Sequence, residues 1–227
     1  MELSLTCASC NVQECINGKE CREHLPKNCP TRSEEFEREC MQEYMKPDIN
    51  KFYITAGETG MFCKVNKWPR VMESLEFCRR MGYRKIGIAS CVGYAKEANI
   101  CAKIFRREGF EVETVVCSAG GLNELSIGCD TDPYYWDGEN FAVGCNPIGQ
   151  AKLLNEAGCE FNLVLGLCVG HDSLFMKYSE APTSVLFTKD RYMNHNPLAG
   201  IYYGYSCLAP ENRPKPKTAH PSRSEEK

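Results

Sequence analysis

The sequence has little excess charge and no long apolar run. Its 27 basic and 30 acidic side chains leave a formal net charge of −3, so neither a nucleic acid nor an anionic membrane surface is an expected partner. The longest apolar stretch, near residues 161–169, is far shorter than the roughly 20 residues of a membrane-spanning helix. Residues 1–5 lack the basic and apolar regions of a signal peptide. We therefore expect a cytoplasmic protein, with its oligomeric state left open.

Cysteine, in contrast, is abundant. Sixteen of the 227 residues are cysteines, a density usual in small secreted proteins that disulfides hold together. The long apolar pattern of this chain is unlike such scaffolds and favours reduced thiols. Some thiols are expected to be ordinary core residues, above all Cys78 and Cys101 on apolar helix faces, and others to be metal ligands.

The composition divides the chain into four parts. Residues 1–30 form a cysteine-rich module, 31–82 a helical segment, 83–209 an α/β domain, and 210–227 a polar, Pro-rich tail typical of disorder. Within the domain, 122–144 is an irregular insert. Thr31 begins a capping-box pattern and is the predicted N-cap of the first helix.

Short apolar runs that alternate with helical patterns indicate the fold class. Buried strands separated by helices are typical of a parallel sheet covered on both faces. The predicted strands lie near residues 85–89, 111–116, 162–167 and 184–188. We therefore predict an α/β fold with a Rossmann-like parallel sheet of about four or five strands flanked by helices.

Four cysteines fall where such a sheet holds its ligands. Cys91, Cys117 and Cys168 follow three predicted strands, and Cys145 precedes the helix that leads into the third of these. Right-handed crossovers bring all carboxyl ends of the strands to one edge, where ligands bind. Strands lie about 4.8 Å apart, so the four thiols are candidate cofactor ligands. The alternative is that they are small residues buried at packed strand ends.

Polar residues follow the third predicted strand. Cys168, His171 and Asp172 are candidate catalytic residues, with His171 as general acid or base. His171 would equally serve as a metal ligand or a cap, and Asp172 as an N-cap. Asp190, Arg191 and His195 follow the fourth strand, on the same edge or in an ordinary polar loop.

The first 30 residues are too few to bury a core, so metal coordination by thiolates is the expected source of order. The C-x2-C pair Cys7 and Cys10, with Cys15 and Cys29, forms the predicted site, and Cys21 and His24 are spare donors. Either Zn²⁺ or an iron–sulfur cluster would suit these ligands.

Several strings of residues carry a likeness to a known family. They lie at 25–30, 85–91, 145–151, 166–173 and 190–197. Over roughly residues 5–203 the chain resembles the domain-of-unknown-function 1847 family, whose bacterial and archaeal members, mostly from anaerobes, are usually labelled metal-binding proteins. The site chemistry is also similar to that of thiouracil desulfidases, which hold a [4Fe–4S] cluster by three cysteines and leave one iron open.

Three functions remain for such a chain. The first is an iron–sulfur enzyme of desulfidase-like chemistry with one or two [4Fe–4S] clusters, acting on a small molecule that contains sulfur or oxygen. The second is a zinc-binding interaction protein without catalysis, with Zn²⁺ above all at the N-terminal site. The third is a redox protein that transfers electrons or thiols.

Overall fold

The computed structural model describes residues 7–17, 19–129 and 143–207. The chain divides into two compact units, Met1–Pro69 and Arg70–Lys227. The predicted tail at 210–227 lies outside the described residues, as does most of the insert predicted at 122–144.

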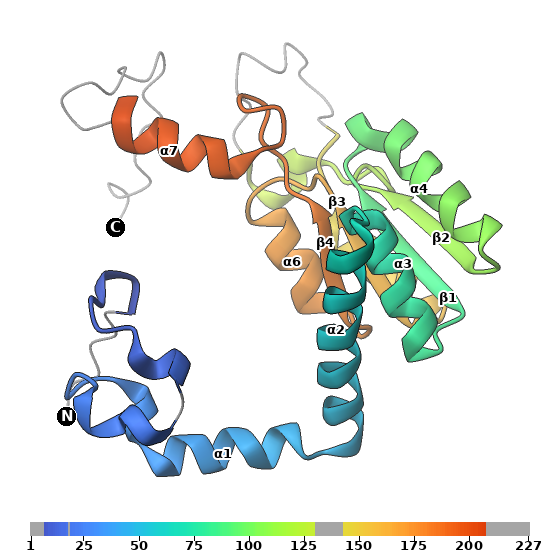
Figure 1. Ribbon diagram of the computed structural model, residues 1–227. Coiled ribbons are helices and arrows are strands. Elements are labelled where there is room, and N and C mark those ends of the chain that lie inside the picture. The colour runs from blue at the N-terminus through green and yellow to red at the C-terminus, as the bar shows by residue number, and fades with distance from the viewer. Residues whose placement is uncertain (1–6, 18, 130–142, 208–227) are drawn as a thin grey trace. The chain divides into compact units, whose positions relative to one another are not determined.

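The first unit holds two α-helices, α1 (Glu34–Tyr44) and α2 (Pro47–Asn66), shown in Figure 1. The prediction that Thr31 caps the first helix is wrong. Thr31 lies inside a short 3-10 turn, and the hydroxyl of Ser33 instead accepts a hydrogen bond from the Phe36 N–H at 3.1 Å. Three further 3-10 turns precede these elements, at Cys7–Ser9, Glu14–Asn17 and Lys19–His24.

The second unit is built on a four-stranded parallel sheet, which confirms the predicted α/β fold. The strand order is β2-β1-β3-β4. The strands are β1 (Lys85–Ser90), β2 (Glu111–Val116), β3 (Phe161–Leu165) and β4 (Thr183–Phe187).

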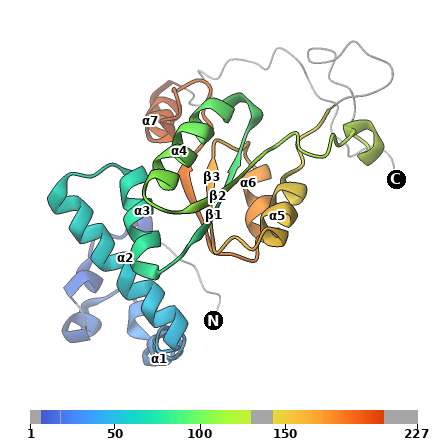
Figure 2. The ribbon, with the colours of Figure 1, turned by 90° about the vertical axis from the view of Figure 1, so that its right-hand side faces the viewer.

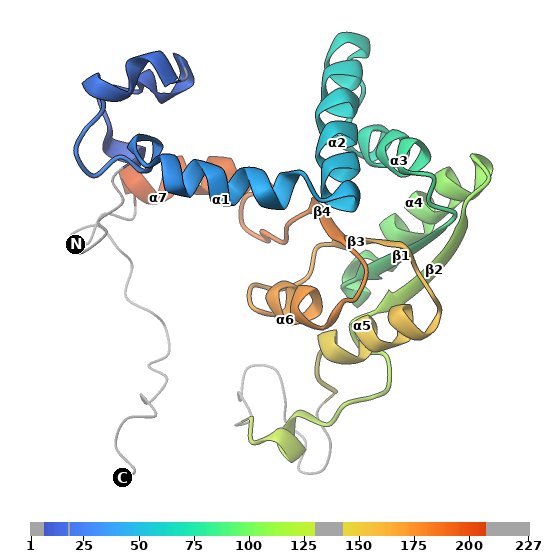
Figure 3. The same ribbon diagram turned by 90° about the horizontal axis from the view of Figure 1, so that it is seen from below.

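Helices cover both faces of this sheet, as Figures 2 and 3 show. The helices α3 (Arg70–Met81) and α4 (Ala95–Arg107) lie on one face, and α5 (Pro147–Glu156) and α6 (His171–Tyr178) on the other. A last helix, α7 (Pro197–Cys207), follows β4 and was not predicted.

None of the described helices is both long and apolar enough to cross a membrane.

The structure groups α3 with the sheet rather than with the helices before it. The Arg70 side chain donates from Nε to the Val185 carbonyl at 2.8 Å and from Nη2 to the Ser184 hydroxyl at 3.1 Å. These bonds attach the first turn of α3 to β4, so the unit begins at Arg70. The predicted segment boundary lay at residue 82.

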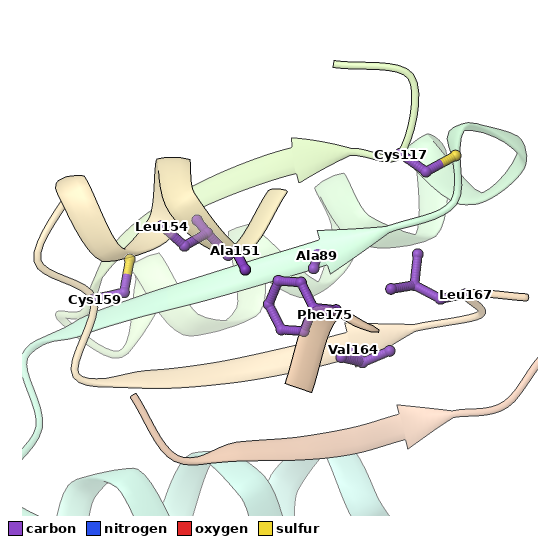
Figure 4. Close-up of a cluster of buried hydrophobic side chains, with 8 residues drawn as sticks. All are labelled: Ala89, Cys117, Ala151, Leu154, Cys159, Val164, Leu167 and Phe175. Carbon is purple, nitrogen blue, oxygen red and sulfur yellow. The ribbon is translucent and has the colours of Figure 1, made fainter. Parts of the chain in front are cut away.

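An apolar cluster fills the space between the sheet and the α5 and α6 layer. Figure 4 shows its eight side chains, with Cys117 at the carboxyl-end side of the strands and Cys159 at the opposite end. The cysteines Cys91 and Cys145, only partly buried, pack against the same cluster. At the carboxyl edge of the sheet, the apolar core is therefore bordered by the side chains of Cys91, Cys117 and Cys145.

The ladder of the sheet continues past the strands at this edge. The Cys91 N–H donates to the Leu165 carbonyl at 3.2 Å, and the Cys117 N–H donates to the Ser90 carbonyl at 2.8 Å. With order β2-β1-β3-β4, the chain passes from β1 to β2 on one side, and from β2 it returns past β1 to β3 and β4 on the other side. The crevice between the ends of β1 and β3 is the point where α/β sheets bind ligands.

A glycine in β1 is required by its neighbour on β3. Gly87 pairs with Asn162, and a Cβ at position 87 would lie 1.9 Å from the Asn162 Oδ1 and 2.9 Å from the Leu154 Cδ1. Asn162 and Leu154 are both fully buried, so neither side chain can move aside cheaply.

We predict that Gly87→Ala destabilises the chain by about 1–3 kcal/mol, the usual cost of overpacking a core. Urea denaturation followed by circular dichroism measures this loss. Gly57→Ala in α2 is the matched control, because no atom lies within 4 Å of its added Cβ. Equal stability of Gly87→Ala and the wild type would contradict this packing.

Candidate functional site

The four predicted cysteines lie at the carboxyl edge of the sheet. Cys91 and Cys117 directly follow β1 and β2, Cys168 is the third residue after β3, and Cys145 precedes α5. Cys117 is buried, with 3% of its surface exposed, whereas the other three are half-buried.

One asparagine joins the loops of Cys117 and Cys145. Asn146 donates from its backbone N–H to the Cys117 carbonyl at 2.6 Å and from Nδ2 to the Ala119 carbonyl at 3.2 Å. Its Oδ1 accepts from the Gly149 N–H at 2.8 Å and so caps α5. Cys145 is therefore held next to Cys117 by the cap of the helix that follows it.

Cys168 is reached through a left-handed glycine. Gly166 has φ +61°, and a Cβ there would lie 2.6 Å from the Tyr94 ring and 2.7 Å from the Phe187 ring. The chain thus turns sharply beneath two aromatic rings before it presents the Cys168 thiol.

A lysine that the sequence analysis missed lies among the thiols. Lys189 Nζ donates to Cys91 Sγ at 2.9 Å and to Cys168 Sγ at 3.2 Å. Arg191 Nη2 lies 3.9 Å from Cys168 Sγ. Lys189 comes one residue after the predicted end of the fourth strand, and this place at the carboxyl edge is the sequence signal that marks it.

The thiols influence one another's protonation. A hydrogen bond from Cys145 lowers the pKa of the Cys117 thiol to about 5, against the effect of burial, with help from the Val92 N–H, Cys91 and Lys189. The same hydrogen bond, with burial, raises the pKa of Cys145 far above its usual range. Burial alone would lower the pKa of Lys189, but its hydrogen bonds to Cys91 and Cys168 outweigh burial and raise it. The group thus holds a thiolate, a thiol donor and an ammonium.

A tyrosine and a histidine lie beside the lysine. Tyr94 Oη and His195 Nε2 are 2.9 Å apart, and Lys189 Nζ lies 5.8 Å from the centroid of the Tyr94 ring. Asn194 and His195 have φ +49° and +62°, left-handed values that cost roughly 1–3 kcal/mol each in residues other than glycine. His195 was predicted at this edge, but Tyr94 was not singled out.

The predicted roles of His171 and Asp172 stay predictions. Among the described residues, His171 Nδ1 is buried without a hydrogen-bond partner. Asp172 Oδ1 accepts from the Gly170 N–H at 3.0 Å and the Ser173 N–H at 2.8 Å. The carboxylate thus stabilises the start of α6, although the N-cap itself is Gly170.

The predicted N-terminal metal ligands do not form a cluster in the structure. Cys7 and Cys15 are exposed, and Cys10 and Cys29 are half-buried. Arg32 Nη1 instead donates to three carbonyls of this segment, at 2.8–3.2 Å. Across the described parts of the chain, no group of three or more His, Cys, Asp or Glu side chains is arranged to hold a metal ion. A metal at this module or at the sheet edge therefore stays a prediction.

The cysteines expected in the core are buried there. Cys78 is fully buried and Cys101 is 4% exposed. Burial raises the pKa of Cys78 to about 12 and that of Cys101 to about 11. These thiols stay protonated at neutral pH, in contrast to Cys117.

The chain is similar to known proteins over most of its length. The model of a family described as "Protein of unknown function (DUF1847)" matches residues 29–186, a range that holds all four edge cysteines. An uncharacterized protein of Methanocaldococcus jannaschii, MJ0455, is 40% identical over 208 residues, which cover 88% of this chain and 95% of the relative. Both findings agree with the resemblance drawn from the sequence.

We predict that Cys145→Ala raises the pKa of Cys117, because the largest cause of its lowering is the hydrogen bond from Cys145. The ultraviolet absorbance of the thiolate, followed as the pH of the metal-free protein falls, measures this change. The thiolate of the wild type should persist well below the usual thiol pKa of about 8.5.

Cys159→Ala serves as the control, because burial raises the pKa of Cys159 to about 11 and leaves no thiolate to lose. Identical titrations for the wild type and Cys145→Ala would show that the two thiols do not interact.

Proposed function

The chain belongs to the protein family of unknown function DUF1847, and we propose that it binds a thiolate-ligated metal centre, an iron–sulfur cluster, at its sheet edge. The ligands would come from Cys91, Cys117, Cys145 and Cys168. One observation carries the proposal: pairwise contacts link thiols from four separate loops. The Cys117 thiol interacts with Cys145 and Cys91, and Lys189 bonds both Cys91 and Cys168.

The chemistry of this donor set suits a soft metal. Metals bind thiolates, not thiols, and Cys117 already has a pKa of about 5. An all-sulfur environment favours zinc or iron–sulfur clusters over hard cations such as Mg²⁺. Lys189 and Arg191 would balance the negative charge of a thiolate-ligated centre.

Metal binding requires local change at two residues. Lys189 would leave its position between Cys91 and Cys168, which its flexible four-carbon stem allows. Cys145 would lose the proton that it shares with Cys117. Both changes involve side chains, while the backbone ladder and the Asn146 cap stay in place.

A bound cluster with one open iron would supply a Lewis acid for a small molecule that contains sulfur or oxygen. The chain's own contribution would be to orient the centre and to supply protons. Cys168, His171 and Asp172 remain the candidate catalytic residues on the β3 side of the edge.

A second candidate function rests on the Cys117 and Cys145 pair. A hydrogen-bonded thiolate and thiol are also the reduced state of many dithiol redox sites. This function requires reversible disulfide formation between the two, with oxidation of both thiols by an external disulfide. A Zn²⁺ site is the third arrangement that the same ligands would accept.

We predict that the protein purified without oxygen contains iron and inorganic sulfide. The double variant Cys91→Ser with Cys168→Ser should lose the edge cluster, because it removes two of its four ligands. Elemental analysis and sulfide determination per chain measure the loss. Cys129→Ser is the control, because Cys129 is an exposed thiol outside the group.

Triple replacement of Cys7, Cys10 and Cys15 by Ser tests the N-terminal module separately. Iron that survives this change but not the edge change would lie at the sheet edge. Zinc without sulfide in the wild type would favour the zinc arrangement, and a metal-free protein would contradict metal binding at the edge.

We also predict that metal binding at the edge strengthens as pH rises through the neutral range. The raised pKa of Cys145 keeps its proton in the metal-free state, so a metal must displace that proton. Calorimetry with Zn²⁺ as the probe, in buffers of different ionisation enthalpy, counts the protons released. Cys145→Ala should release fewer, and equal release by both proteins would contradict the predicted role of Cys145.

A further inference from the structure

Tyr94 contacts two of the residues at the cysteine-rich edge of the sheet, Cys91 and Lys189. Its backbone N–H donates to the Cys91 carbonyl at 2.9 Å. The ammonium of Lys189 lies 5.8 Å from the Tyr94 ring centroid and 2.9 Å from Cys91 Sγ, so ring and thiol share one cation. The ring also contacts Phe187, at a centroid distance of 5.2 Å, and closes over Gly166. Tyr94 is therefore held over the carboxyl ends of β3 and β4, next to the loop that carries Cys91.

The hydrogen bonds of His195 determine its tautomer. The Asp190 N–H donates to His195 Nδ1 at 3.1 Å, and a nitrogen that accepts a hydrogen bond carries no hydrogen. In the neutral ring the hydrogen must then be on Nε2. Nε2, 2.9 Å from Tyr94 Oη, therefore donates to the tyrosine.

In this direction the Tyr94 hydroxyl hydrogen is not the one that forms the bond with His195. Among the described residues, the only hydrogen bond of Tyr94 Oη is the one with His195, and there the oxygen is the acceptor. Accepting a hydrogen bond strengthens a hydroxyl as a donor, because hydrogen bonds in a chain polarise one another. The hydroxyl hydrogen is therefore available for a second hydrogen bond.

The backbone around His195 supports a positioning role. Asn194 and His195 are consecutive left-handed residues, and the His195 N–H donates to the Asp190 carbonyl at 2.8 Å. The backbone of Asp190 thus forms hydrogen bonds with both the backbone and the imidazole ring of His195. Strain of this kind persists where the surroundings over-determine it, commonly at functional sites.

We propose that Tyr94 donates its hydroxyl hydrogen bond to a sulfur atom of the centre held by the edge thiols, and that His195 is the residue that positions it. The inference rests on the proposed function, since it names a residue that tunes the same metal centre. Hydrogen bonds to cluster sulfurs are one of the factors that set a cluster's reduction potential, because they stabilise the more negative reduced state. The bond from Tyr94 would raise the potential.

The test compares reduction potentials of the iron-loaded full chain. Tyr94→Phe should keep the iron and sulfide content of the wild type but have a more negative midpoint potential. His195→Leu, which removes the Nε2 donor, should shift the potential in the same direction by less. Tyr83→Phe is the matched control, because Tyr83 lies at the amino end of β1 and stacks on Phe161; its potential should equal that of the wild type.

Nitrogen NMR of the histidine ring in the metal-free protein tests the positioning role independently. His195 should carry its hydrogen on Nε2, and an Nδ1–H ring would overturn the proposal. An unchanged potential in iron-loaded Tyr94→Phe would overturn it as well, while leaving the metal site intact. A wild-type protein without iron and sulfide would instead overturn the proposed function and, with it, this inference.

Discussion

The parallel pairing of β1 with both β2 and β3 is the constraint on which the site depends. The pairing extends one residue past the strands, so the backbones of Cys91 and Cys117 are held by the sheet itself. Cys168 enters from β3 through the turn at Gly166, and Cys145 is attached to the Cys117 loop by Asn146. A shift of register by one residue would turn each side chain to the other face. The positions of the thiols are thus a consequence of how the sheet is paired.

Charge decides what these four thiols can do together. Adjacent thiolates would repel one another. The hydrogen bond from Cys145 lowers the pKa of Cys117 while the pKa of Cys145 itself is raised, and the Lys189 ammonium bonds the other two thiols. The helices α4, α5 and α6 begin next to these cysteines, and helix N-termini favour nearby negative charge. The positive charge of a bound metal centre would replace the proton on Cys145 and the Lys189 ammonium as the charge that balances the thiolates. The same surroundings that stabilise a thiolate would therefore stabilise an anionic cluster.

The sequence predicted the sheet and the place of the four cysteines, because apolar runs mark buried strands and strand ends mark ligand sites. It did not predict α7, because the α7 sequence is apolar almost throughout and shows no alternation of apolar and polar faces. It did not predict the Ser33 cap, because Thr31 and Ser33 are both hydroxyl residues that could cap α1. Lys189 follows the fourth predicted strand, but a single lysine at a strand end carries no metal-ligand pattern that would mark it beside the cysteines. The pairing of Tyr94 with His195 joins residues 101 positions apart, and no local pattern reveals such a contact.

The most direct measurement is the location of iron in crystals of the protein purified without oxygen, from anomalous scattering at the iron absorption edge. We expect a peak bounded by Cys91, Cys117, Cys145 and Cys168, with Lys189 displaced from between the Cys91 and Cys168 thiols. A second peak among Cys7, Cys10, Cys15 and Cys29 is compatible with it. Iron found only at the N-terminal module, with Lys189 still bonded to both edge thiols, would contradict the account.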